Sequence, residues 1–350
     1  MTFTLYVDEA RWRSHLRATV ESTPGIVPVI KGNGYGLGNA RLAAEAAALG
    51  VDTVAVGTAD ELAVVQEHFA GDVLVLAPSY PAPFDDPSRR VLQTAAHLPT
   101  VRSAGGSRIV VEAVTSMHRH GLGVTDVPAL AAALDGTERP AAASSGPIRL
   151  EGLAFHLPMD RHGGYDPVAE VADWLRRLGA AGVPTQVAWV SHLDRLRGEF
   201  PATAFRPRIG TALWLGDRDA LQPRGTVLDV HRLPRGTRYG YRRRRASRDC
   251  HLVVVSGGTA HGVALEAPRT ARGPVGRGKA LAQGTLAAAN LSLSPFRWAG
   301  RARWFAEPPH MHVSLLLLPA SVPPPEIGAE LDCQARLTTL HPDRVAPQSG

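Results

Sequence analysis

The sequence has few of the features that mark disulfide-rich, metal-ligating or membrane proteins. Its 350 residues include two cysteines, Cys250 and Cys333, which lie far apart and show no metal-ligand spacing. A disulfide framework is not expected in a chain of this length with two thiols. No run approaches the ~18 apolar residues of a transmembrane helix, and no charged region precedes an apolar one at the N-terminus. These absences predict a soluble, cytoplasmic protein.

Acidic residues are in deficit, and the formal net charge is +6 with a sequence pI of about 9.8. Most of the basic residues are Arg, and such a balance suits either nucleic acid or small anionic ligands such as phosphates and carboxylates. The sequence has no RNA-binding aromatic signature and no zinc-finger spacing. We therefore expect a small-molecule ligand, with neither nucleic acid nor membrane as a partner.

The hydrophobic content of 44% allows a large buried core, and the pattern changes near residue 222. Over 1–222, short apolar runs alternate with Ala- and Leu-rich helical stretches, which predicts βα units and favours a (β/α)8 barrel. Over 223–350, strand-like runs are separated by Gly, Pro and Arg, which predicts a mostly β domain. The predicted strands are 26–30, 54–56, 73–76, 108–111, 150–155, 186–190, 226–230, 251–255 and 313–318, and the clearest helices are 39–49, 128–134 and 168–178.

The most specific motif is VIKGNGYGLG at residues 29–38, in which an apolar strand runs into Lys31. A lysine at the carboxyl end of a barrel strand lies where barrel active sites are built. Its apolar neighbours are expected to desolvate the ammonium in part and to favour an attacking amine. The glycines let backbone N–H groups approach a phosphate, and the Tyr35 hydroxyl adds a donor. These residues indicate an attacking lysine beside a phosphate site.

This string resembles the lysine motif of the alanine racemase family, whose cofactor is pyridoxal 5'-phosphate (PLP) and in which Lys-Ala-(Asn/Asp)-Ala-Tyr-Gly-His-Gly is usual. The resemblance implies a PLP enzyme of the barrel class, with a β-rich domain after the barrel and a head-to-tail homodimer. It also implies a Schiff base between Lys31 and PLP, and contact of Tyr35 with the cofactor phosphate.

A second string, PRIGTALWLG at 207–216, is similar to the family's Arg-x-Gly-Ile-x-x-Tyr-Gly. The match implies that Arg208 faces the pyridine nitrogen of PLP and that the backbone of Gly210 and Thr211 holds its phosphate. A permanently cationic guanidinium keeps that nitrogen unprotonated. The cofactor is then a weaker electron sink, which suits brief deprotonation of an α-carbon and discourages side reactions.

Shorter matches extend the resemblance to other positions. They imply that Ser191 lies on the phosphate, that His156 stacks against the cofactor ring, and that Arg119 lies near the phenolic oxygen of PLP. Glu112 occupies the position at which several racemases carry a carbamylated lysine. We hypothesise that its carboxylate supplies that negative charge directly.

The resemblance implies that Tyr239, in LPRGTRYG at 233–240, is the second catalytic group and reaches into the partner subunit's site. Lys31 and Tyr239 would then exchange protons on opposite faces of one α-carbon. A phenol has a pKa near ~10, so neighbouring positive charge has to lower it. The run Arg242–Arg245 is a conceivable source, although a solvated or phosphate-binding basic patch is the simpler interpretation.

The chain departs from the family on the substrate side. The family's Gly-Tyr-Ala-Asp-Gly is replaced at 258–262, where Thr259 and His261 stand for the tyrosine and the acid, and its Met-Asp pair is Met311-His312. These positions support PLP binding more firmly than alanine as substrate. Histidines in place of two acids would suit a larger or more acidic amino acid.

The leading prediction is therefore an amino-acid racemase or epimerase, and three alternatives stay open. One is another PLP barrel enzyme, a decarboxylase or an aldolase. Arg208 disfavours the decarboxylase, and an aldolase would want metal ligands, for which His156, His261 and His312 show no strong spacing. Another is a PLP carrier, against which Tyr239 and the β-rich domain argue, or a catalytically degenerate PLP-binding protein, an alternative that the lost Gly-Tyr-Ala-Asp-Gly motif keeps open. Nucleic-acid binding rests on charge alone.

Overall fold

The computed structural model describes residues 2–136, 146–159, 164–190, 194–265, 278 and 292–348. Contacts divide the chain into two compact units. The barrel unit comprises 15–34 and 38–216, and the β unit comprises 1–14, 35–37 and 217–350. A domain boundary after residue 222 stays a prediction. Within the described residues, no helix combines the length and the apolar character needed to cross a membrane.

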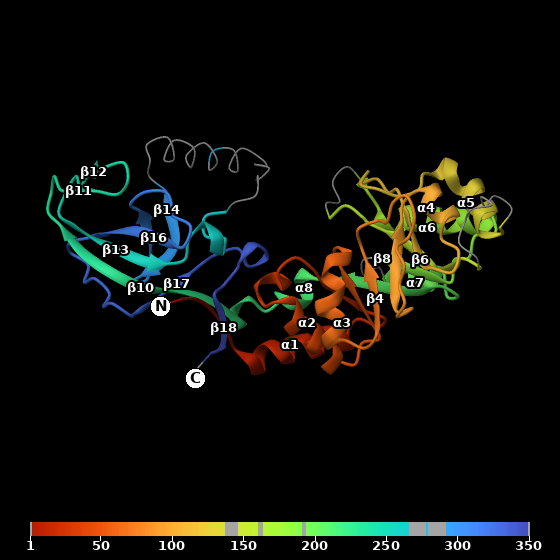
Figure 1. Cartoon of the computed structure of the whole chain (residues 1–350), viewed down its shortest axis with the longest axis horizontal. Helices are drawn as coiled ribbons and strands as arrows, with labels where there is room; N and C mark the ends of the chain where they lie inside the picture. The colour runs from red at the N-terminus through yellow and green to blue at the C-terminus, as the bar shows by residue number, and fades with distance from the viewer. Residues whose placement is uncertain are drawn as a thin grey trace. The chain divides into compact units, whose positions relative to one another are not determined.

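The barrel unit is a closed ring of eight parallel strands, which confirms the predicted fold class. Figure 1 labels three of these strands, β4, β6 and β8, among the helices of the unit. Each strand pairs with the next along the chain, and the last closes onto the first through Val27 and Arg208. The strands are β2 (Val27–Ile30), β3 (Thr53–Val56), β4 (Asp72–Val75), β5 (Val91–Ala95), β6 (Arg108–Ala113), β7 (Arg149–Phe155), β8 (Val187–Val190) and β9 (Ala204–Ile209).

Side chains along these strands point alternately into the barrel and outward toward the helices. One set of alternate side chains forms an interior cluster, namely Val27, Val29, Ala55, Leu74, Leu92, Val110, Ala154 and Trp189. The other set packs outward against the helices. The helices are α1 (Glu9–Glu21), α2 (Asn39–Ala48), α3 (Leu62–His68), α4 (Leu98–Arg102), α5 (Val127–Leu134), α6 (Pro167–Ala180), α7 (Asp194–Glu199) and α8 (Thr211–Trp214). Helix α6 shows the local cause, because Asp166 accepts the Val168 N–H at 2.9 Å while Pro167 opens the helix.

Two barrel strands, β5 and β9, were not among the predicted runs. Strand β5 carries Gln93 and Thr94, which interrupt its apolar character, yet both side chains are buried. Their polar atoms form hydrogen bonds with neighbouring segments of the same chain. Thr94 donates to Val75 O at 2.6 Å, and Gln93 accepts the Phe84 N–H at 2.9 Å. Hydrophobic pattern alone cannot find such a strand, because its polar groups are buried through hydrogen bonds.

The β unit is a mostly antiparallel sheet, as predicted for the C-terminal part of the chain. Its strands are β1 (Phe3–Val7), β10 (Leu221–Leu233), β13 (Cys250–Ser256), β14 (Leu293–Trp298), β15 (Arg301–Phe305), β16 (Val313–Pro319), β17 (Glu330–Cys333) and β18 (Arg344–Pro347). The long β10 shifts register between Val227 and Asp229; it pairs with β17 before the shift and with β13 around and beyond it, so six strands close a ring. Strand β1 adds to this sheet through β10 and β18. A short hairpin, β11 (Arg238–Tyr239) with β12 (Arg244–Arg245), extends from it.

Candidate active site at the carboxyl end of the barrel strands

Lys31 directly follows the buried strand β2 and begins a glycine-rich turn. Gly32 and Gly34 have φ of +61° and +62°, and a Cβ on Gly34 would lie 2.7 Å from the Asn39 backbone nitrogen. Glycine is therefore required at position 34 by both conformation and space. The Lys31 side chain is exposed, so the expected partial desolvation by the apolar strand is not observed within this chain. The turn presents an accessible amine at the mouth of the barrel.

Glu61 holds this turn in place, and it was not among the predicted site residues. One carboxylate oxygen accepts the Gly32 N–H at 2.5 Å, and the other accepts the N–H groups of Gly57 at 2.6 Å and Thr58 at 3.3 Å. Gly57 lies against Lys31 itself, because a Cβ built there would be 3.2 Å from the Lys31 Cβ. The sequence did contain a signal, since Thr58 and Glu61 have the Ser/Thr-x-x-Glu spacing of a capping box.

Arg208 is the penultimate residue of strand β9, and its side chain is buried, at 8% exposure. It donates to Phe155 O at 2.9 Å, and its Nη1 lies 3.8 Å from the Glu112 carboxylate, which is 3% exposed. The same carboxylate lies 3.8 Å from His120 Nε2. Burial lowers the pKa of Arg208, and the nearby Glu112 opposes that shift. The buried Glu112 carboxylate therefore lies between the Arg208 guanidinium and the imidazole of His120, a residue that was not predicted.

His156 follows strand β7, and the Thr115 hydroxyl donates to its carbonyl oxygen. The Nη1 of Arg119 lies 3.4 Å from Nε2 and 3.5 Å from Nδ1 of its ring. Burial lowers the pKa of His156 to about 4, and the charges of Arg208, Arg119 and Lys31 act in the same direction. The imidazole is therefore neutral near pH 7, which suits stacking and hydrogen bonding and not charge pairing.

A carboxylate on helix α6 fixes the segment that carries Arg119. Glu170 accepts the Ser116 N–H at 2.5 Å and the Ser116 hydroxyl at 3.0 Å, and Tyr165 donates to it at 2.7 Å. Burial and the hydrogen bond to Glu170 raise the pKa of Tyr165 to about 12, so the phenol stays protonated as a donor. The Arg119 segment is thereby anchored to the helical layer.

The predicted phosphate ligands are placed as follows. Gly210 precedes helix α8, whose Trp214 donates from its indole to Val29 O at 2.8 Å and so ties the helix to strand β2. Thr211 opens that helix. Ser191 lies outside the described residues. Tyr35 belongs to the β unit by its contacts, with a buried ring and a φ of +58°.

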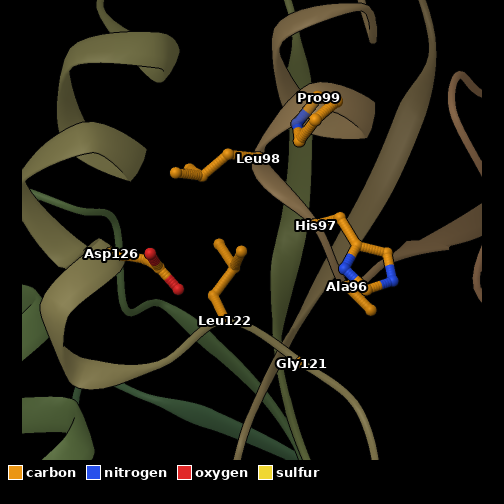
Figure 2. Close-up of a pocket in the computed structure, with 7 residues that line it drawn as sticks. All are labelled: Ala96, His97, Leu98, Pro99, Gly121, Leu122 and Asp126. Carbon is orange, nitrogen blue, oxygen red and sulfur yellow. The ribbon is translucent and has the colours of Figure 1, made fainter.

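A hollow of about 270 Å³ lies beside the Arg119 segment, and its lining includes none of the predicted site residues. Figure 2 shows the Asp126 side chain reaching into it between two leucines. Asp126 already accepts the Gly123 N–H at 2.8 Å, so its carboxylate has a structural partner. The lining is Ala96, His97, Leu98, Pro99, Gly121, Leu122 and Asp126. This hollow does not account for the polar cluster around Lys31.

The β unit holds the other predicted catalytic group, Tyr239. Its ring is 8% exposed and belongs to an apolar cluster with Leu233, Cys250 and Leu252. Burial raises the pKa of the phenol, whereas the neighbouring Arg244 lowers it. Burial is thus the larger influence within one chain, and the expected net lowering by the arginine run is not observed.

The predicted substrate-side residues also lie in the β unit, and His261 has partners at both ring nitrogens. Its Nδ1 accepts the Gly258 N–H at 3.1 Å, so Nε2 carries the proton and donates to Asp343 at 3.1 Å. Asp343 in turn accepts the Phe3 N–H at 2.8 Å. The His312 ring lies edge-on to His261 at 5.7 Å between centroids, and Met311 is exposed. His261 therefore has a structural role in joining three segments.

The structure brings together Lys31, Arg119, His156 and Arg208 in the barrel unit, with Glu112 and His120 among them. A closed eight-stranded parallel barrel with such a cluster at the carboxyl ends of its strands has the architecture of a barrel enzyme. The family model described as "Alanine racemase, N-terminal domain" matches residues 7–192, and the chain belongs to this family.

Solved structures share the fold over the whole chain. The alanine racemase from D-cycloserine-producing Streptomyces lavendulae is 18% identical, with a TM-score of 0.67 over 100% of this chain and 98% of that one. The alanine racemase of Clostridium difficile 630 is 13% identical, with a TM-score of 0.71 over 100% and 97%. The Bartonella henselae alanine racemase "with covalently bound pyridoxal phosphate" is 15% identical, with a TM-score of 0.70 over 99% and 100%. No curated protein matches the sequence.

Proposed function

We propose that this protein is a PLP-dependent amino-acid racemase or epimerase that works as a homodimer. Lys31 would hold the cofactor and exchange the α-proton on one face of the substrate. Tyr239 of the partner subunit would exchange it on the other face. The observation that carries the proposal is the exposed amine of Lys31, placed at the mouth of the barrel in a cluster with Arg119, His156 and Arg208.

The charges of this cluster fit an anionic cofactor. Among the described residues, neither Lys31 nor Arg119 forms an ion pair, and both lie close enough to His156 to lower its pKa. A phosphate-bearing ligand would supply the missing negative charge. The sequence contains only two lysines, Lys31 and Lys279, so few amines are available for covalent attachment. The second lies outside the described residues.

Each residue of the cluster has a distinct part in this proposal. When bound, PLP withdraws electrons from the α-carbon of an attached amine. The buried Arg208 would remain charged beside the pyridine nitrogen, since Glu112 compensates it at 3.8 Å. The neutral His156 would contact the ring, and Arg119 would bind an anionic oxygen. Lys31 and Tyr239 would act as acid and base on opposite faces.

The substrate remains the open part of the proposal. Thr259 and His312 replace family residues on the substrate side, which supports an amino acid larger or more acidic than alanine. His261 is less available for this role, because both of its nitrogens have partners within the β unit. A His312→Asp variant that prefers the same amino acid as the wild-type protein would remove this residue from substrate selection.

The test compares two lysine variants of the full chain, Lys31→Ala and Lys279→Ala. An absorbance band near ~420 nm in the wild-type protein that persists in Lys279→Ala and disappears in Lys31→Ala would support attachment at Lys31. Exchange of the α-proton in deuterium oxide across an amino-acid panel would then name the substrate. Cofactor binding without exchange would favour decarboxylation, cleavage or a binding role. A protein that binds no PLP when it is supplied would refute the proposal.

A further inference from the structure

The hairpin that carries Tyr239 has little secondary structure of its own. Strands β11 and β12 share two residue pairs, Arg238 with Arg245 and Tyr239 with Arg244. A two-stranded hairpin of this size is marginal in water. Some other group must therefore hold the turn that follows Tyr239, and the structure shows which one.

That group is the carboxylate of Glu307, which is buried at 4% exposure. It accepts the Tyr241 N–H at 2.9 Å. Between the two tyrosines, Gly240 has a φ of +70°, and a Cβ built on it would lie 2.3 Å from the Glu307 Oε2. The carboxylate thus rests directly on the backbone of the turn, and the glycine allows that approach.

Glu307 is itself fixed by neighbours on the same segment. His310 Nε2 lies 2.8 Å from its Oε1, and the His310 ring packs on Tyr241 with 4.7 Å between centroids. A second hydrogen bond joins the hairpin to this segment, in which Arg244 Nη1 donates to Ala306 O at 2.8 Å. Residues 306–310 therefore contact both the turn that follows Tyr239 and strand β12.

We propose that Glu307 is the positioning residue for Tyr239, holding the 239–241 turn through the Tyr241 N–H and the Gly240 backbone so that the phenol keeps one orientation. This inference rests on the proposed function of Tyr239 as one of the two bases. A purely structural acid would support folding and affect both faces of the substrate alike. A positioning residue for Tyr239 affects one face only.

The charge of Glu307 has a second consequence for Tyr239. Burial raises the pKa of the phenol, the charge of Glu307 raises it further, and Arg244 lowers it. Removing the charge while keeping the hydrogen-bond acceptor should therefore move the alkaline titration of Tyr239 to lower pH. This separates the electrostatic effect of Glu307 from its hold on the backbone.

Two variants make that separation. Glu307→Asp keeps the charge but shortens the side chain by one methylene, so it no longer reaches the Tyr241 N–H. Glu307→Gln keeps the reach, because the amide oxygen can accept from Tyr241 while the amide nitrogen donates to the other tautomer of His310. Glu326→Asp, at an exposed position of the same unit, is the matched control.

The readout has to be specific for one face. Because the equilibrium constant of racemisation is one, no variant can change the ratio of kcat/KM in the two directions. Exchange of the α-proton with retention of configuration does distinguish the faces. Tyr239→Phe identifies the enantiomer whose proton Tyr239 removes. Hydrogen exchange of the Tyr241 amide provides a readout that does not depend on activity.

We expect Glu307→Asp to slow retention exchange on the Tyr239 face by about 10- to 100-fold, which is no more than the lower end of the effect of a general base. Exchange on the Lys31 face should stay wild-type, and the variant should add nothing in a Tyr239→Phe background. The Tyr241 amide hydrogen should exchange faster in Glu307→Asp than in the wild-type protein. In Glu307→Gln, both this amide and the substrate α-proton on the Tyr239 face should exchange at wild-type rates.

Equal losses on both faces, or wild-type behaviour of Glu307→Asp, would overturn the inference while leaving the racemase proposal intact. A wild-type protein that exchanges no α-proton on either face would overturn both. If Glu307→Asp fails to fold, Glu307→Gln still tests the inference. Slowed α-proton exchange on both faces in Glu307→Gln would contradict a role that depends only on the reach of the side chain to the Tyr241 N–H.

Discussion

The turn after Lys31 and the turn after Tyr239 are built alike but carry their side chains into opposite surroundings. In each turn, a backbone segment that contains glycine donates an N–H to a carboxylate, Glu61 in the barrel unit and Glu307 in the β unit. Lys31 is exposed among cationic groups, whereas Tyr239 is buried among apolar side chains. A carboxylate holds the backbone of each turn, so the two turns differ in what surrounds the side chains of Lys31 and Tyr239.

This difference bears on how each group would act as a base. The charges of Lys31, Arg119 and Arg208 all act to lower the pKa of His156, while the Glu61 carboxylate accepts the Gly32 N–H in the Lys31 turn. Around Tyr239, burial prevails over the charge of Arg244 and raises the phenol pKa. An anionic ligand would suit the cations that act on His156, whereas burial disfavours the ionised form of Tyr239.

Replacing the two bases should have unequal effects. Lys31→Ala should abolish α-proton exchange on both faces, because it removes the cofactor attachment together with one base. Tyr239→Phe should lower exchange on one face by about 10²- to 10⁴-fold and leave the other unchanged. Exchange with retention, followed by NMR for each enantiomer, checks this. Loss on both faces in Tyr239→Phe would contradict the separate roles of the two turns.

Glu112→Gln should destabilise the barrel unit by about 3 kcal/mol, because the buried Arg208 loses its carboxylate. Urea denaturation measures the change, with Glu326→Gln as an exposed control in the β unit. A wild-type midpoint for Glu112→Gln would show that the Phe155 carbonyl alone satisfies Arg208. This variant therefore tests how far the stability of the barrel unit, which carries the Lys31 turn, depends on the buried pair of Glu112 and Arg208.

The glycines beside the two carboxylates should tolerate alanine differently. Gly240→Ala should cost about 2–4 kcal/mol, because φ is +70° and the new Cβ would lie 2.3 Å from Glu307. Gly57→Ala should cost about 1 kcal/mol, because its Cβ would meet the Lys31 Cβ and Glu61 Oε2 at 3.2 Å and φ is not positive. Denaturation midpoints compare them, and equal losses would mean that the Tyr239 turn is not the more tightly packed.

The smallest expected effect is a titration. The His156 ring should titrate with a midpoint near 4, observed by NMR of its ring protons. Since the unfolded chain binds the proton near pH 6.5 and the folded chain only near 4, the contribution of His156 to stability is intact above pH 6.5 and declines as the pH falls toward 4. A midpoint near 6.5 would show that the His156 ring is less buried than the structure indicates.

The strands and helices with strong periodicity could be predicted from the sequence, and the rest could not. The apolar runs that became β2, β3, β4, β6, β7 and β8 are buried on both faces, so they are continuous in the sequence. Strand β5 escaped because Gln93 and Thr94 are buried through hydrogen bonds. Strand β1, at the N-terminus, was not predicted, because its partners, β10 and β18, lie far along the chain.

The same division applies to the candidate site. Lys31 and Arg208 lie in local strings whose residues define their chemistry, so the sequence singled them out. Glu61 and Glu307 act on backbone N–H groups of other segments, and only the fold shows those contacts. His261 illustrates the reverse case, because a residue singled out as substrate-side proved to be bonded to Gly258 and Asp343.

The alternation that forms the barrel, the β-rich second part and the lysine string can all be recognised in the sequence, because periodicity and glycine conformation are local properties. Only the folded chain shows which charges meet, namely Glu112 with Arg208 and Arg119 with His156. It also shows that Lys31 is exposed and Tyr239 is buried. Burial and charge proximity arise from residues distant in sequence, so a local pattern cannot specify them.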